Sequence, residues 1–89
     1  MKLSSAQGHV VRRMAAGWAL KAHRDLEGHK QFQLHHPNGS TESVDWDVAE
    51  SLAEYGLIDS NQKFPAATYW LTENGKAAAR ELSPGPSAN

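Results

Sequence analysis

Apolar residues recur every three or four positions near the start of the chain, which is the spacing of an amphipathic helix. This spacing is shared by Val10, Val11, Met14 and Trp18. Ser4 followed by Gln7 is a capping-box pattern, in which each side chain bonds the other residue's backbone N–H, so the helix is expected to begin there. Gly17 suits the position that ends a helix. The pattern predicts a first helix over residues 5–16.

Two segments after Gly17 alternate apolar and polar residues, which is typical of half-buried strands. They span residues 18–23 and 31–35, and their apolar side is formed by Leu20, Ala22, Phe32 and Leu34. Pro37-Asn38-Gly39 favours a tight turn, because Pro presets one turn position and Gly accepts a positive φ. A returning strand is expected over residues 41–44. The middle of the chain therefore predicts a small antiparallel meander.

Helical spacing returns over residues 45–55. Its apolar stripe consists of Val44, Val48, Leu52 and Tyr55. Asp45 is a suitable cap for the start of this second helix, and Gly56 for its end.

Two short strands and a last helix are expected beyond Gly56. The strands are residues 57–59 and 68–71, on either side of a polar loop. Thr72 is placed to cap the last helix, which runs to about Leu82. Residues 83–89 are rich in Pro, Gly and Ser, and they are predicted to form a disordered tail.

These elements predict one α+β domain over residues 1–82, in the order α-β-β-β-α-β-β-α, followed by the tail. A chain of 89 residues is the size of a single domain with one modest core. The residues expected in that core are Val10, Met14, Leu20, Phe32, Leu34, Val48, Leu52, Leu57, Ile58, Tyr69, Leu71 and Ala78.

Two runs in the second half resemble a known family. They read Val48-Ala-Glu-Ser-Leu-Ala-Glu-Tyr-Gly-Leu-Ile58 and Tyr69-Trp-Leu-Thr-Glu-Asn-Gly-Lys-Ala-Ala78. Over residues 44–80 the chain is similar to the second half of winged-helix domains of the MarR and PadR groups of bacterial regulators. The resemblance implies a helix-turn-helix-like fold, a wing over residues 61–67, and DNA binding in transcription regulation.

The first half departs from that family. A hairpin stands where a winged helix has another helix before its recognition helix. The helix in the recognition position, residues 45–55, contains no Lys or Arg and turns Asp47, Glu50, Ser51 and Glu54 outward. Because DNA affinity comes largely from Lys and Arg that neutralise phosphates, the family's recognition role is not carried over to this helix.

The charge is distributed unevenly, although the net charge is only −1. Residues 1–41 have a balance of +4, and residues 42–89 have a balance of −5. Such asymmetry favours separate binding faces, although it also fits two ordinary solvated surfaces. The candidate DNA-binding residues of the basic half are Arg12, Arg13, Lys21, His23, Arg24 and Lys30. On the first helix and the hairpin they could contact phosphates of double-stranded DNA, so a DNA-associated regulator or accessory factor is the first functional hypothesis.

The acidic helix gives the alternative hypothesis. Trp46, Asp47, Glu50 and Glu54 could anchor a basic protein surface, provided that Trp46 is exposed and not packed beneath the hairpin. Small winged-helix proteins of phages, including some anti-CRISPR proteins, resemble this arrangement. The resemblance implies a phage or mobile-element adaptor or inhibitor that blocks a partner.

Other functions lack a pattern in the sequence. The absence of Cys excludes disulfides and thiolate metal sites, and the five His residues lack metal-ligand spacing, so neither a metal nor another cofactor is expected. No nucleophile motif or glycine-rich phosphate loop points to an enzyme or to a small-molecule substrate. No apolar run is long enough for a membrane span, and the polar N-terminal region is unlike a secretory signal, so a cytoplasmic protein is expected.

Overall fold

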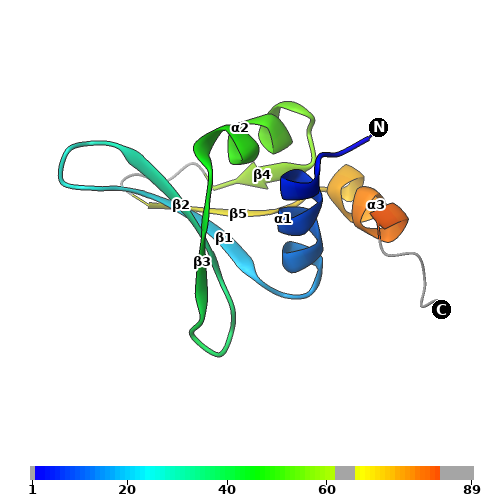
Figure 1. Cartoon of the computed structure of the whole chain (residues 1–89), viewed down its shortest axis with the longest axis horizontal. Helices are drawn as coiled ribbons and strands as arrows, with labels where there is room; N and C mark the ends of the chain where they lie inside the picture. The colour runs from blue at the N-terminus through cyan, green and yellow to red at the C-terminus, as the bar shows by residue number, and fades with distance from the viewer. Residues whose placement is uncertain (1, 62–65, 83–89) are drawn as a thin grey trace.

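The computed structural model describes residues 2–61 and 66–82, and Figure 1 shows how the elements are arranged. In chain order they are α1 (Ser5–Ala15), β1 (Ala19–Arg24), β2 (Lys30–His35), β3 (Thr41–Val44), α2 (Trp46–Glu54), β4 (Ile58–Ser60), β5 (Ala66–Leu71) and α3 (Glu73–Leu82). The prediction of an α+β domain is confirmed. The predicted tail and Phe64 of the predicted wing lie outside the described residues.

All five strands join one antiparallel sheet in the order β3-β2-β1-β5-β4, so the meander and the two later strands form a single sheet. The connection is made at β1, where Leu20 lies opposite Leu34 on one side and Tyr69 on the other. In Figure 1 the turns that join β1 to β2 and β2 to β3 form two tips that project away from the helices. The N-terminal and C-terminal halves of the chain therefore meet at the centre of the sheet.

The helices cover one face of this sheet, and the opposite face is open. α1 packs against α3, α2, β2 and β5, and α2 rests on β2 and β4. Along β1, Leu20 and Ala22 are buried beneath the helices, so Lys21 and His23 point to the open face.

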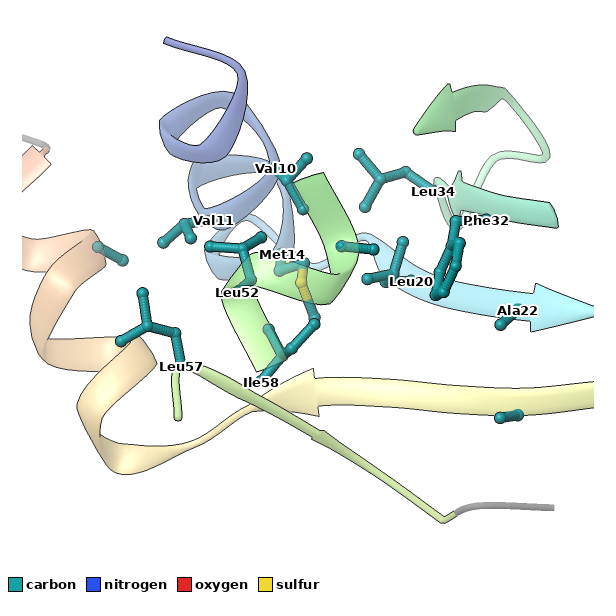
Figure 2. Packing of buried hydrophobic residues seen from close by; sticks show 13 residues of the cluster. Val10, Val11, Met14, Leu20, Ala22, Phe32, Leu34, Leu52, Leu57 and Ile58 are labelled. Atoms are coloured by element: carbon teal, nitrogen blue, oxygen red, sulfur yellow. The ribbon is translucent and has the colours of Figure 1, made fainter. Parts of the chain in front are cut away.

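Side chains from α1, α2 and the strands meet in a single core (Figure 2). Of the twelve residues expected there, Val48, Tyr69, Leu71 and Ala78 are partly buried at its edge and the others are buried. The small residues Ala22, Ala49, Ala67 and Ala79 are also buried, together with Val11. They allow the helices to lie close to the sheet.

One expectation for α2 was wrong and another was confirmed only in position. Tyr55 does not belong to the apolar stripe, since it is 46% exposed at the helix C-cap. The buried arc of the helix is centred on Ala49 and Leu52, which places Tyr55 on its flank. Asp45 occupies the N-cap position as predicted, but its side chain makes no capping hydrogen bond.

The Leu71-Thr-Glu-Asn-Gly75 run fixes the start of α3. Thr72 Oγ1 accepts the N–H of Gly75 at 3.1 Å and donates to the carbonyl oxygen of Gly56. Gly75 is buried, and a Cβ at this position would overlap the carbonyl oxygen of Leu57. Glycine is therefore needed where α3 passes against the turn that ends α2.

No helix within residues 2–61 and 66–82 is both long enough and apolar enough to cross a bilayer.

Candidate functional site

The six basic residues predicted to contact DNA lie on different parts of the molecule. Arg12 and Arg13 belong to α1, in the helical layer. Lys21 and His23 lie on the open face of the sheet, on the opposite side. Residues 24 and 30 face one another at the far end of the β1–β2 hairpin. The fold thus separates the predicted DNA-binding residues into three places.

Arg13 is engaged inside the molecule. Its Nη2 lies 3.2 Å from Glu42 Oε2, and its guanidinium carbon lies 4.8 Å from the ring centroid of Trp18. Glu42 also contacts His9 Nε2 at 2.8 Å. The hydrogen bond from His9, followed by the positive charge of Arg13, holds the pKa of Glu42 below its usual value of 4.5. This cluster ties α1 to β3, so Arg13 has a structural role.

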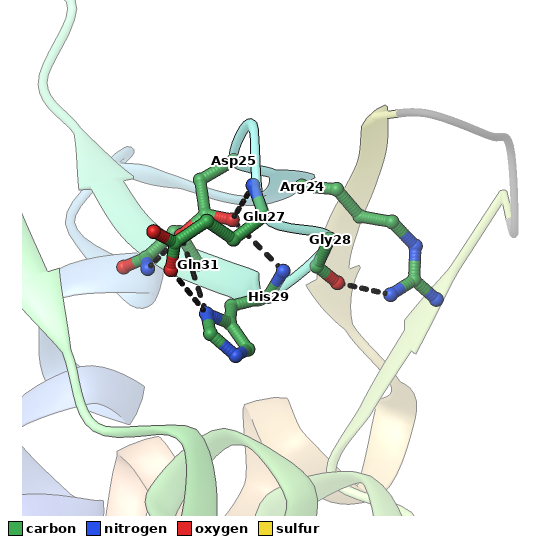
Figure 3. Close-up of polar contacts among 6 residues, drawn as sticks. All are labelled: Arg24, Asp25, Glu27, Gly28, His29 and Gln31. Atoms are coloured by element: carbon green, nitrogen blue, oxygen red, sulfur yellow. Dashed lines mark hydrogen bonds and ion pairs between the residues drawn. The ribbon is translucent and has the colours of Figure 1, made fainter.

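The β1–β2 hairpin ends in a turn organised by Asp25 (Figure 3). Asp25 Oδ1 accepts the backbone N–H groups of Glu27 and His29, both at 2.9 Å, and Oδ2 accepts Gln31 Nε2 at 3.2 Å. These bonds, that of His29 first, lower the pKa of Asp25 from its usual value of 3.8. The Asp25 carboxylate therefore accepts hydrogen bonds from turn N–H groups that have no backbone carbonyl partner in the turn.

The cations beside this turn also contact their own hairpin. Arg24 Nη1 donates to the carbonyl oxygen of Gly28 at 2.8 Å, and Lys30 Nζ lies 5.4 Å from the ring centroid of Phe32. Arg12 projects from the exposed side of α1. No continuous basic face is formed by the six predicted residues.

The predicted acidic face of α2 forms as a continuous surface. Trp46, Glu50 and Glu54 follow one another at four-residue intervals along the helix, and Asp47 lies beside them. The Trp46 side chain is 59% exposed, Asp47 and Glu54 are exposed, and Glu50 is half-buried. Within the described parts of the chain, none of these carboxylates forms an ion pair.

Sequence reasoning did not identify a groove of about 780 Å³ between the end of α1, β5 and α3. Trp18 and Trp70 line it together with Lys76 and Arg80 of α3. One signal was present in the sequence: Lys76 and Arg80 are four residues apart and therefore share one side of a helix. Their proximity to the two Trp residues depends on the sheet order, which the sequence did not reveal.

Among the described residues, no three His, Asp or Glu side chains are grouped closely enough to hold a metal ion. Neither a protein-family model, nor a curated protein, nor a solved structure matches this chain.

Proposed function

We propose that this protein is a non-catalytic binding module that docks the Trp46 face of α2 onto a basic protein surface. One observation carries the proposal: Trp46 is 59% exposed at the start of α2, beside the acidic residues Asp47 and Glu50. A large aromatic ring left in water loses the stabilisation that burial would give. Burial of the ring in a partner's pocket recovers it, as is typical of Trp residues that dominate binding energy at interfaces.

The neighbouring carboxylates define the chemistry of that partner. Glu42 and Glu73 contact the cations Arg13 and Lys76 of this chain. Asp47 and Glu54, by contrast, are exposed without an ion pair among the described residues. Uncompensated charge around an apolar anchor suits a pocket surrounded by Lys and Arg, because complementary potentials speed association and orient the partners.

Basic surfaces of this kind are typical of nucleic-acid-binding proteins. An acidic helix that binds such a basic surface competes with nucleic-acid phosphates for the same Lys and Arg side chains. We therefore propose an adaptor or inhibitor of a nucleic-acid-binding partner, in line with the resemblance to partner-blocking phage proteins.

We also propose that the domain is a variant winged helix. Support comes from the sheet, in which β1, β5 and β4 are neighbours, and from α2, which directly precedes β4. In this proposal β2 and β3 replace a helix of the usual fold. DNA binding through Arg12, Arg13, Lys21, His23, Arg24 and Lys30 remains a separate prediction, although the separation of these residues does not favour it.

The experiment measures binding of a fluorescently labelled amphipathic peptide, with Lys and Arg around a stripe of Leu, to the full chain by anisotropy. We expect Trp46→Ala to weaken binding by about tenfold or more, because it removes the apolar anchor. We expect Glu50→Lys/Glu54→Lys to weaken it by at least about tenfold, because it reverses the charge around that anchor.

Glu73→Lys/Glu81→Lys on α3 is the matched control, since it changes the net charge equally at exposed positions away from α2. It should retain binding within about threefold, apart from general charge effects. A second peptide with Ser in place of Leu controls for purely ionic attraction. Equal losses in the two double variants, or no loss in Trp46→Ala, would show that α2 is not the binding face.

A further inference from the structure

The groove beside α3 has the form of a small-molecule site. Its volume of about 780 Å³ is within the range of roughly 300–1,000 Å³ that ligand pockets occupy. It is lined by Met14 and Trp18 from the end of α1 and its following turn, by Tyr69 and Trp70 of β5, and by Lys76 and Arg80 of α3. It does not include the α2 face.

One aromatic wall of the groove is held in place before any ligand arrives. Arg13 lies over the Trp18 ring at 4.8 Å from its centroid, and the His36 ring meets it edge-on with centroids 4.8 Å apart. Arg13 is itself fixed by Glu42. A ring positioned in this way loses little conformational freedom on binding, which favours affinity.

The other aromatic wall is accessible. Trp70 is 47% exposed, because strand alternation turns its side chain away from the core against which Tyr69 and Leu71 pack. Aromatic residues that line a groove favour planar aromatic ligands, because stacked and edge-to-face ring contacts are favourable.

Two cations border the same space. Lys76 and Arg80 lie one helical turn apart on α3 and both line the groove. Lys76 Nζ lies 3.6 Å from Glu73 Oε2, an exposed pair that contributes little and is easily exchanged. Arg80 makes no ion pair with any residue that the structure describes. The groove is therefore apolar and aromatic with a positively charged border.

We infer that this groove binds a planar aromatic molecule that carries one anionic group, with its ring packed against the aromatic residues that line the groove and its charge at Lys76 and Arg80. The aromatic walls provide contact area, and Arg80 provides a guanidinium suited to paired contacts with a carboxylate or a phosphate. The charge border selects against neutral and cationic aromatic molecules of the same shape.

The test follows the three Trp indole N–H signals of the ¹⁵N-labelled full chain by NMR. The probes form matched sets: AMP, adenosine and ribose 5-phosphate, and indole-3-acetate with indole-3-acetamide. We expect AMP or indole-3-acetate to shift the signals of Trp18 and Trp70 and to leave that of Trp46 unchanged. The neutral counterpart of each active probe should bind about tenfold more weakly, as should ribose 5-phosphate, which lacks a ring.

Arg80→Gln should weaken binding of the anionic probe by about five- to tenfold while its neutral counterpart changes by less than about twofold. Arg12→Gln removes an exposed charge outside the groove and is the matched control. A response to AMP alone identifies a nucleotide-type ligand, and a response to indole-3-acetate alone identifies an aromatic carboxylate. The inference is overturned if no probe shifts the two signals, or if neutral and anionic probes bind equally.

Discussion

At the scale of single residues, Gly75 is the position where side-chain volume matters most. Its Cα faces the carbonyl oxygen of Leu57, and there is no space for a Cβ. We predict that Gly75→Ala lowers the free energy of unfolding by about 1–3 kcal/mol, because the backbone of α3 must shift away from the turn after α2. Urea unfolding followed by circular dichroism measures this change.

Asn74→Ala provides the control for that substitution. Asn74 is the preceding residue of the same helical turn and is exposed. It should change stability by no more than about 0.5 kcal/mol, as expected for a surface site. If Gly75→Ala changed the free energy of unfolding as little as Asn74→Ala, the result would contradict the close approach of α3 to Leu57.

Glu42 gives a residue-scale prediction about pH. Its pKa in the folded chain is below 4.5, chiefly because His9 hydrogen-bonds to the carboxylate. The ionised carboxylate therefore stabilises the folded state. This contribution to the free energy of unfolding is fully present above the pKa of Glu42 in the unfolded chain, and it is lost as the pH falls through the lower pKa of the folded chain. We predict that Glu42→Gln reduces the loss of stability seen when the pH is lowered from neutral into this acidic range.

The measurement compares urea unfolding of the wild type and Glu42→Gln across that pH range. Glu81→Gln, an exposed acid of α3 without an ion pair among the described residues, is the control and should retain the wild-type pH dependence. An NMR titration that places the pKa of Glu42 at or above 4.5 would contradict the role assigned to the His9 contact.

Local residue patterns were predictable, whereas contacts between distant residues were not. Ser4 and Gln7 are close in sequence, and their reciprocal capping bonds were predicted from spacing alone. Arg13 and Glu42 are 29 positions apart, and their ion pair depends on how β3 is placed beside α1. Arg13 was therefore treated as a candidate for phosphate contact, although its side chain holds Glu42 and Trp18.

At the scale of elements, the start of α1 is held by its cap. The N–H of Gln7 donates to Ser4 Oγ at 3.1 Å, and the N–H of Ser4 donates to Gln7 Oε1 at 2.8 Å. We predict that Ser4→Ala lowers the free energy of unfolding by about 0.5–2 kcal/mol. Ser5→Ala is the matched control, because Ser5 is exposed and is not the cap. Similar losses from both substitutions in chemical denaturation would contradict the capping role.

The position of α2 was predictable, but its exposure was only partly so. Asp45 and Gly56 correctly indicated its two ends. The exposure of Trp46 could not be derived from the sequence. Whether an apolar residue in the first turn of α2 is buried depends on where the preceding strand β3 lies. Gln7 Nε2 donates to Ser51 Oγ at 2.8 Å and joins α2 to α1, another contact that only the tertiary structure reveals.

At the scale of the whole molecule, the sheet determines which surfaces exist. The sequence predicted two groups of strands but not that β1 joins them. Because strand residues alternate between faces, β1 places Lys21 on the side opposite Arg12 of α1. The basic half of the chain is therefore divided among three places, whereas the acidic residues of α2 stay together on one helix. Charge balance along the sequence gave no information about this difference.

We propose that the molecule binds a basic protein surface through α2 in preference to DNA. The most direct measurement titrates the wild type, in parallel, into the labelled basic amphipathic peptide and into a labelled mixed-sequence DNA duplex, at low and near-physiological salt. We predict that the peptide binds, that the Trp46→Ala variant binds it less, and that the duplex does not bind. Duplex binding that weakens steeply with salt, and is lost in Arg12→Ala/Lys21→Ala, would contradict this proposal and establish the basic residues as the functional site.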